Sequence, residues 1–433
     1  MRALVALVRV PHSMHSDDAA RAAPVWQDAV LSADDEIRAY ALEGLEAIRD
    51  AHPTLIETRT VPYLLHHLPT HIEAPPLRVR VILCALARLC TTPALFPLFS
   101  QRVWDTLEAM GACEADAAHV GYVCAMIVAL HVAMEEQVSA GDAHVREHAE
   151  DLAQRLVAYR RAPIAAHAHV AQHASDLLVL VGPHVSPEVA SALASGVYAA
   201  PPWDAPCAAV MVGLPRAASV PHASAWLHDV LATPPSTLPQ HWLLCALANK
   251  YVAHDDARAL ADALWPDLAA PERPLEARVA AVHAWVWLAR GLLARGDDTG
   301  TAMLDRVRTE LFPAPDIGMQ AANALRILAR HDALLTRANG FQVRMLYKQR
   351  LLDRLLPQLV DDYRAHAESP AAMTYLVALA TLLPALPDAA VSGRVTELLP
   401  LLVHTLSIPD AHARASAARA LSTALAELPE RPI

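Results

Sequence analysis

The sequence has few glycines and few aromatic residues. Only 13 of its 433 residues are glycine, and Phe, Trp and Tyr together make up 5%. A β-rich fold needs many tight turns and favours β-branched and aromatic side chains, so this composition argues against one. Alanine and leucine are abundant instead, with arginine and glutamate, and these residues favour helix. We therefore predict an all-α protein.

Several signatures of catalytic and cofactor-binding sites are also missing. Neither of the two lysines follows a glycine, which excludes a Walker P-loop, and there is no GxGxxG or GxSxG motif. The cysteines form no CxxC pair and no zinc or iron–sulfur spacing, and they fit a reducing compartment; they are Cys84, Cys90, Cys113, Cys124, Cys207 and Cys245. The net charge of −11 argues against holding a nucleic-acid backbone. We predict a non-enzymatic protein with no cofactor, no metal and no direct nucleic-acid contact.

Long uncharged runs are scarce. The N-terminal MRALVALVRV is interrupted by Arg9 and is too short for a signal peptide. The best membrane candidate is the uncharged stretch 117–134, which contains two histidines and much alanine. Its length barely suffices to cross a bilayer, and its weak hydrophobicity favours a buried helix of a helical array. We predict no membrane partner.

A pattern of proline, aspartate and arginine recurs at the two ends of the chain. Offsets of 10, 14, 17 and 21 residues lead from Pro24 to Asp34, Arg38, Ala41 and Leu45, and from Pro400 to Asp410, Arg414, Ala417 and Leu421. Pro357 precedes Pro400 by 43 residues and is expected to open another such unit. A period of about 40–47 residues with two helices each is that of HEAT and armadillo arrays. We predict a single continuous α-solenoid over residues 1–433 with about nine or ten helical hairpins, most regular at 24–50 and 340–428.

Local signals place several helix boundaries. Ser32 with Asp35 is predicted to cap the second helix of the first regular hairpin. Two helices are expected around the polar break at 137–142, and further helices at 239–252 and 276–294. The stretch Gly296-Asp297-Asp298-Thr299-Gly300 is predicted to be a plain loop.

Two histidine clusters have spacings that suit a metal. His144, Glu147 and His148 match the HxxEH pattern of inverted zinc peptidases, which would place both histidines on one helix face. A zinc enzyme needs a third ligand and a shaped cavity, and the helix here is polar, so we expect these histidines to be solvated. His169 and His173, with His167 nearby, could chelate a metal, but no carboxylate precedes Asp176. A zinc peptidase remains a disfavoured hypothesis.

The stretch NGFQVRMLYKQR, residues 339–350, combines polar groups in a way that no other stretch does. The chain has 35 Lys and Arg residues but only two lysines, Lys250 and Lys348. In a chain that otherwise uses arginine, a lysine indicates a position that requires lysine in particular, because the two are not interchangeable at a specific contact. The predicted partner-binding residues are Arg344, Tyr347, Lys348, Gln349 and Arg350. In the alternative interpretation Tyr347 packs between repeats, and Lys348 and Arg350 pair with acids such as Asp353 or Asp361.

The same stretch resembles a signature of one family. NGFQVRMLYKQR, followed by LLDRLLPQLVDDY, TYLVALATLLPALP and ELLPLLVHTLSIPD, is similar to the C-terminal HEAT-repeat region of the scaffold subunits of the cytosolic iron–sulfur (CIA) targeting complex. That family is also known as the methyl-methanesulfonate-sensitivity "nineteen" nucleotide-excision-repair and TFIIH regulators. Earlier strings match in the same order, namely LIETRTVPYLLHHLP, LCALARLCTTPALF, LLCALANKYV and AWVWLARGLLARG. Both lysines fall in matched strings, and the C-terminal signature covers 339–428.

The resemblance implies a non-enzymatic adaptor of the cytoplasm and nucleus. Expected partners are a WD-repeat propeller subunit, a small reactive-cysteine subunit, and apo-proteins awaiting iron–sulfur clusters, among them DNA repair and replication enzymes. It also implies that a comparable N-terminal solenoid precedes this region in family members, and that the scaffold itself ligates no cluster. The alternative function is a generic HEAT-repeat adaptor, such as a transport receptor or a phosphatase-type scaffold.

Overall fold

The computed structural model describes residues 15–69, 76–113, 116–232, 237–330, 334–382 and 395–426. Every regular element among them is a helix, and none is a strand. The chain divides into two compact units, residues 1–218 and 219–433. The all-α prediction is confirmed, whereas the prediction of one continuous solenoid stays a prediction.

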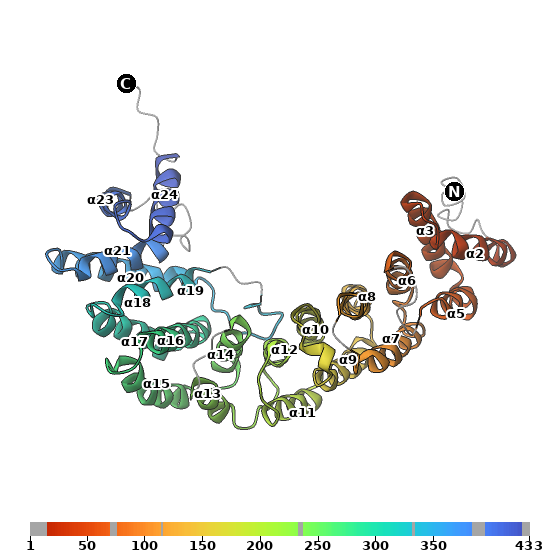
Figure 1. The fold of residues 1–433 in the computed structure, drawn as a ribbon, viewed down its shortest axis with the longest axis horizontal. Coiled ribbons are helices and arrows are strands. Elements are labelled where there is room, and N and C mark those ends of the chain that lie inside the picture. The colour runs from red at the N-terminus through yellow and green to blue at the C-terminus, as the bar shows by residue number, and fades with distance from the viewer. Residues whose placement is uncertain are drawn as a thin grey trace, which may run out of the picture. The chain divides into compact units, whose positions relative to one another are not determined.

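The described helices of the first unit pair into five hairpins (Figure 1). The pairs are α2 (Ser16–Val30) with α3 (Asp35–Ala51), α5 (Val61–His66) with α6 (Pro76–Leu89), α7 (Phe96–Met110) with α8 (Ala117–Ala140), α9 (Val145–Tyr159) with α10 (Ala168–Val181), and α11 (Pro187–Tyr198) with α12 (Ala205–Gly213). Short helical elements occupy several connections, namely α4 (Pro53–Leu55), η1 (Ile56–Thr60), η2 (Pro163–Ala166) and η3 (Gly182–His184). The second helices α3, α6, α8, α10 and α12 pack on one another in sequence, and we call them the second-helix row of this unit.

The described part of the second unit also forms five hairpins. They are α13 (Ala223–Ala232) with α14 (Leu238–Lys250), α15 (His254–Ala269) with α16 (Leu275–Arg295), α17 (Asp298–Arg306) and η4 (Val307–Leu311) with α18 (Gly318–Ala324) and α19 (Arg326–Ala329), α20 (Tyr347–Ala365) with α21 (Ala371–Leu382), and α23 (Val395–Thr405) with α24 (Ala411–Ala426). Its second-helix row is α14, α16, α18 with α19, α21 and α24. Because one hairpin cannot bury the apolar stripes of both its helices, each relies on its neighbours for a shared core.

The predicted repeat register is visible in the hydrogen bonds at both ends of the chain. Asp34 caps α3 and Asp410 caps α24, each accepting from backbone N–H groups of the first turn. Four residues later an arginine reaches back to the turn between the helices: Arg38 Nη1 donates to Ser32 O at 2.7 Å, and Arg414 Nη1 donates to Ile408 O at 2.6 Å. Each arginine therefore donates a hydrogen bond to the backbone carbonyl oxygen six residues before it. The string RALVALV and residues 427–433 lie outside the described residues.

Two kinds of predicted boundary were wrong, namely a helix cap and the start of a repeat unit. The N-cap of α3 is Asp34 rather than Ser32, whose Oγ instead accepts from Asp34 N at 3.2 Å. Pro24, Pro357 and Pro400 do not open units, because they lie inside α2, α20 and α23. Proline fits the first turn of a helix but also occurs at kinks, and the sequence alone did not separate the two cases. The positions of the aspartate and arginine in the register were correct at both ends, although the role given to the prolines was not.

The long apolar stretch near residue 120 forms α8. This helix alone, among those described, is long and apolar enough to cross a membrane, and half of its apolar window is buried in the fold. It lies between α6 and α10 in the second-helix row. The predicted break after it is also present, because α8 ends at Gly141 in the left-handed conformation and α9 begins at Val145.

Candidate partner-binding site

The signature segment, residues 339–350, is a loop followed by the first turn of a helix. Residues 339–346 are turns and irregular backbone, and α20 begins at Tyr347. Tyr347, Lys348, Gln349 and Arg350 thus form the first turn, while Arg344 belongs to the loop. A loop of this length needs partners for its backbone groups, and these come from two earlier helices.

The buried side chain of Asn249, at the end of α14, holds the loop. Its Nδ2 donates to Gln342 O and to Gly291 O, each at 2.9 Å, and its Oδ1 accepts from Gln342 N at 2.8 Å. Arg344 N donates to Ala294 O at 2.8 Å. An amide that makes three hydrogen bonds at full burial fixes both the position and the orientation of the loop. The ends of α14 and α16 therefore support the signature segment.

Both lysines of the chain contact this segment or its surroundings. Lys250 is 5% exposed, and its Nζ lies 4.4 Å from the centre of the Phe341 ring. Burial lowers the pKa of Lys250 to about 7. Lys348 Nζ donates to Arg330 O at 2.9 Å. The persistence of lysine thus has a structural reason, since a slim ammonium on a flexible stem fits these two positions.

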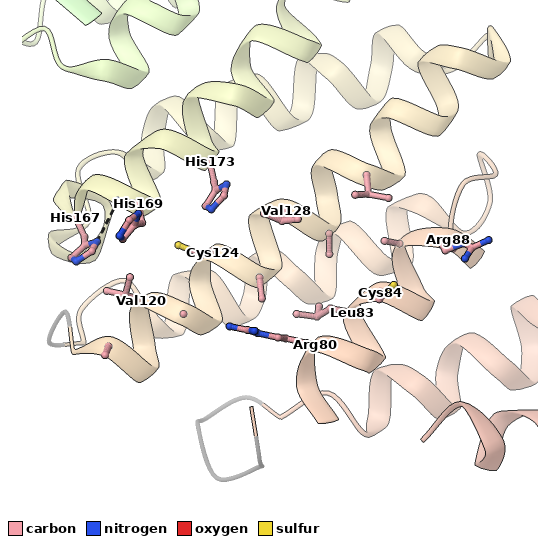
Figure 2. Close-up of a pocket in the computed structure, with 16 residues that line it drawn as sticks. Arg80, Leu83, Cys84, Arg88, Val120, Cys124, Val128, His167, His169 and His173 are labelled. Carbon is pink, nitrogen blue, oxygen red and sulfur yellow. Dashed lines mark hydrogen bonds between the residues drawn. The ribbon is translucent and has the colours of Figure 1, made fainter. Parts of the chain in front are cut away.

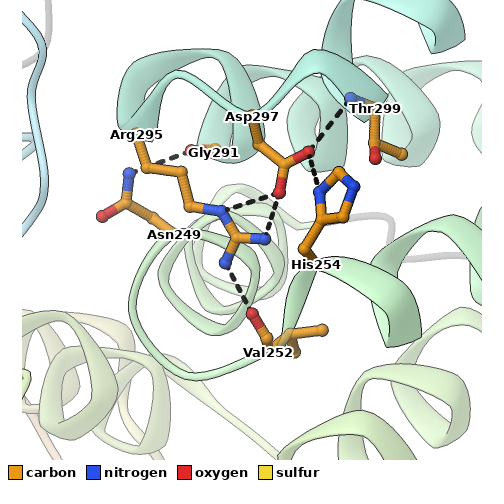
Figure 3. Close-up of polar contacts among 7 residues, drawn as sticks. All are labelled: Asn249, Val252, His254, Gly291, Arg295, Asp297 and Thr299. Carbon is orange, nitrogen blue, oxygen red and sulfur yellow. Dashed lines mark hydrogen bonds and ion pairs between the residues drawn. The ribbon is translucent and has the colours of Figure 1, made fainter.

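The stretch 296–300 is not the plain loop predicted from the sequence. Asp297 is the N-cap of α17, and its carboxylate accepts from Thr299 N at 3.0 Å, His254 Nδ1 at 2.8 Å and Arg295 Nε at 3.2 Å (Figure 3). Arg295 Nη1 also donates to Val252 O at 2.6 Å. Burial alone would raise the pKa of Asp297, but the hydrogen bonds from Arg295 and Thr299 lower it below its ordinary value. The available signal was a glycine that ends one helix directly before an aspartate that caps the next.

Asp297 also lines a cleft of about 200 Å³, and three of the predicted residues line the same cleft. Arg344, Tyr347 and Arg350 line it together with Gly296 and Asp297. Gly296 has φ = 79°, which favours glycine, and a Cβ there would come within 2.2 Å of Arg344 Nε and displace the end of that side chain. The structure thus brings Arg344, Tyr347 and Arg350 together.

A second depression, of about 500 Å³, adjoins the same residues. Arg344, Tyr347 and Lys348 line it together with Met345 and Leu346, and Gln349 lines neither hollow. Met345 is 73% exposed and Leu346 is 58% exposed. Leu346 also has φ = 59°, which is unusual for a bulky side chain. Sequence reasoning missed this exposed apolar pair, whose exposure depends on the loop being fixed from beneath.

The HxxEH residues are not arranged as a zinc site. His144 is the N-cap of α9, and its Nδ1 lies 3.7 Å from Glu147 Oε2. His148, predicted to be solvated, is 7% exposed; its Nδ1 pairs with Gln137 Oε1 at 2.7 Å and its ring packs on Phe96. That prediction was wrong because α9 turns this face toward α7 and α8. Among the described residues, no group of three or more His, Cys, Asp or Glu side chains is placed to hold a metal ion.

The second histidine cluster borders an apolar groove of about 710 Å³ between α6, α8 and the start of α10 (Figure 2). His167 is the N-cap of α10, and its Nδ1 accepts from His169 N at 3.4 Å. His169 and His173 lie along the same edge of the groove. Its floor consists of small apolar side chains of α8 and the thiols of Cys84 and Cys124. Cys84, which lies in an apolar helical run, is exposed rather than buried.

Comparisons with known proteins agree with this architecture. A family model described as "RNAPII transcription regulator C-terminal" matches residues 205–431. The DNA repair/transcription protein MMS19 of Saccharomyces cerevisiae is 27% identical over 183 residues, which are 41% of this chain and 17% of that protein. The human MMS19 nucleotide excision repair protein homolog is 29% identical over 146 residues, 34% of this chain and 14% of that protein. The matched part therefore spans less than a fifth of the length of these relatives.

The solved structure of a Kap121p mutant has a similar fold. It aligns with a TM-score of 0.51 and 13% identity, covering 98% of this chain and 45% of that one. At this identity the likeness concerns the helical-repeat fold alone. The family model covers more than half of the chain, including nearly all of the second unit and the whole signature segment. The chain belongs to the MMS19 family, in the region that the family model describes as C-terminal, and its relatives are named for DNA repair and transcription.

Proposed function

We propose that this chain is a non-enzymatic scaffold of the cytosolic iron–sulfur protein assembly targeting complex, working in cytoplasm and nucleus. In this role it helps to deliver clusters to apo-proteins, including DNA repair and replication enzymes. Family membership and the helical-repeat fold support the proposal, because stacked hairpins offer long surfaces for protein contacts. The proposed partners are the WD-repeat propeller subunit, the small reactive-cysteine subunit, and the apo-proteins themselves.

The observation that carries the proposal is the exposed apolar pair in the signature segment. Met345 and Leu346 are exposed beside Arg337 and Arg344, while Asn249 holds the loop through Gln342. Exposed apolar side chains ringed by arginine are typical of the centre of a protein interface. The left-handed backbone of Leu346 stores strain that a functional contact would explain.

A pull-down from cytosol with the purified chain as bait tests the proposal. We expect recovery of the propeller and small reactive-cysteine subunits, and its loss on Met345→Ser with Leu346→Ser. The matched control is Val403→Ser with Leu406→Ser, which removes exposed apolar side chains from α23 and the turn after it. Circular dichroism should show equal helicity for both variants.

Charge reversals refine the role of each predicted residue. Arg344→Glu and Arg350→Glu should weaken recovery without destabilising the fold, because both side chains are exposed. Lys348→Met should act through stability, since Lys348 anchors the helix start to Arg330 O. Recovery of neither subunit by the unmodified chain would contradict the proposal, and recovery of transport factors or a phosphatase instead would favour the generic adaptor.

A further inference from the structure

The second-helix row of the second unit contains a groove of about 470 Å³ that is lined by cations. Arg326 and Arg330 reach it from the α19 end, Arg419 and His412 from α24, and His283 from α16. We call it the cationic groove and define it by these five residues and Ser416. It is separate from both hollows at the signature segment, with which it shares no lining residue.

The charge of this groove is opposite to that of the chain. The net charge of the protein is −11, yet no carboxylate lines the groove among the described residues. Arg326, Arg330 and Arg419 are all exposed, so their guanidinium groups are available to a ligand. Burial and the nearby Arg326 both lower the pKa of His283, so the positive charge at neutral pH comes mainly from the arginines. Such a local field attracts anionic groups and orients them.

A buried hydroxyl indicates where a ligand atom would bind. Ser416 is 1% exposed and lines the groove, and its Oγ has no hydrogen-bond partner among the described residues. Thr381, which also lines the groove, instead donates to Ala378 O at 2.9 Å. A buried hydroxyl without a partner is unfavourable, so a ligand acceptor that it could reach would be favoured.

Part of the lining of the groove is apolar. Trp287 is 3% exposed and stacks on the His241 ring at 5.8 Å, while Arg290 lies 5.0 Å from the Trp287 ring. Ile327 and Leu238 also belong to this lining. Apolar side chains beside several cations suit a peptide that carries both carboxylates and aliphatic carbon.

We propose that the cationic groove binds an acidic peptide segment of a partner protein. Arginine pairs with carboxylates through two parallel hydrogen bonds, and the groove offers three arginines within one small hollow. A nucleic acid would need a longer basic stripe on a chain without this excess of negative charge. The proposal does not depend on the iron–sulfur role, because any partner with such a segment would satisfy it.

Fluorescence anisotropy with the full chain tests the proposal. The probes are a fluorescein-labelled hexaglutamate, a neutral Gly-Ser peptide of equal length, and a single-stranded hexanucleotide. We expect hexaglutamate to bind more tightly than either other probe, and its affinity to fall as salt is raised. Arg419→Glu and Arg326→Glu should each weaken binding by at least about tenfold. The matched control is Arg258→Glu in α15, a first helix that does not line the groove. It should change hexaglutamate binding less than about twofold, because an exposed charge outside the site contributes little.

Ser416→Ala tests whether hexaglutamate binds at a specific site or is only attracted by the positive charge of the groove. It removes a hydroxyl that has no partner among the described residues, so the unfolding midpoint should not fall, whereas hexaglutamate binding should weaken by about threefold. Equal binding of the neutral peptide, or equal weakening by Arg258→Glu, would overturn the proposal. Tighter binding of the hexanucleotide, lost with the same arginines, would also overturn it in favour of a nucleic-acid site. The subunit pull-down is a separate readout, so failure of one leaves the other interpretable.

Discussion

The two units share one architecture but differ in what their cores contain. Of the described residues, the lysines and arginines that are buried are Lys250, Arg278 and Arg290, and all three lie in the second unit. The buried polar residues of the first unit are neutral amides, hydroxyls and His148. Both units contain a groove with apolar lining, but three arginines line that of the second unit, whereas two, Arg80 and Arg88, line that of the first.

The buried cations tie together segments that are far apart in the sequence. Arg278 pairs with Asp316, and Arg290 Nη2 donates to Arg330 O at 2.9 Å. Lys250 lies on Phe341, beside the Asn249 contact that spans 93 residues. A buried charge is tolerated only where its partners are held in place, so these contacts require particular residues, whereas apolar packing accepts many. The second unit therefore depends more than the first on contacts that only particular residues can make, and it is also the part that the family model matches.

The largest expected difference between the units comes from their buried amides. Asn249→Ala removes three hydrogen bonds at a fully buried position and should lower the free energy of unfolding by about 4 kcal/mol. Gln27→Ala in the first unit removes a single bond to Thr60 Oγ1 and should lower it by about 1–2 kcal/mol. Urea denaturation followed by circular dichroism measures both. Equal losses would show that the loop does not depend on Asn249.

The next effect is the pH dependence that Lys250 gives to the second unit. Its pKa is about 7 in the folded state against 10.5 ordinarily, so the unfolded chain binds more protons above pH 7 and stability should rise with pH. Between pH 7 and 8.5 the gain should be at most about 2 kcal/mol. Lys250→Met should remove this slope. The measurement stops at pH 8.5, because buried thiols and phenols with raised pKa values would reduce stability above it. A slope unchanged in the variant would contradict the assignment.

Two helix-ending glycines provide a closely matched pair with a smaller effect. Gly141 and Gly296 both have positive φ, at 68° and 79°, so alanine should cost about 1 kcal/mol at either. A Cβ at Gly141 meets nothing within 4 Å, whereas one at Gly296 displaces the end of Arg344. Thermal denaturation should therefore show similar losses. Only Gly296→Ala should weaken the proposed subunit recovery, and loss of recovery in both variants would point to a general effect of instability.

The smallest effect on stability is expected from alkylating an exposed cysteine thiol. Cys84 is exposed in the groove of the first unit, while Cys245 in the second unit is fully buried. Iodoacetamide should modify Cys84 in the native chain and leave Cys245 unmodified until urea unfolds the second unit, as peptide mass spectrometry can follow. Alkylation of Cys84 should change the unfolding free energy by less than about 0.5 kcal/mol. Early modification of Cys245 would contradict the burial of its helix α14.

Much of the fold could be predicted from the sequence, because helices and repeats leave local and periodic signals. The offsets from Pro24 and Pro400 predicted the recurring aspartate and the arginine four residues after it, and the structure shows each aspartate capping a helix and each arginine bonded to the preceding turn. The helices around the break near Gly141 and at α14 and α16 were also predicted. The prolines misled because the same residue suits a helix start and a kink.

The candidate site was predicted only in part. Composition and spacing selected Arg344, Tyr347 and Arg350, which the structure brings to one cleft. The Asp297 network was missed in part because the local signal was read as a loop, and in part because His254 comes from a distant helix. The cationic groove was missed for the same reason, since its arginines and histidines come from α16, α19 and α24. No window of sequence contains such a set.

The sequence by itself determined the helical class, the repeat register and the two unusual lysines, because these are properties of neighbouring residues. Only the tertiary structure decided what each lysine does: Lys250 is buried against Phe341, and Lys348 caps the backbone at Arg330. It also decided that Met345 and Leu346 are exposed. The physical reason is that burial and pairing depend on which distant helices meet, and stacking hairpins brings residues 249 and 342 together without any local trace.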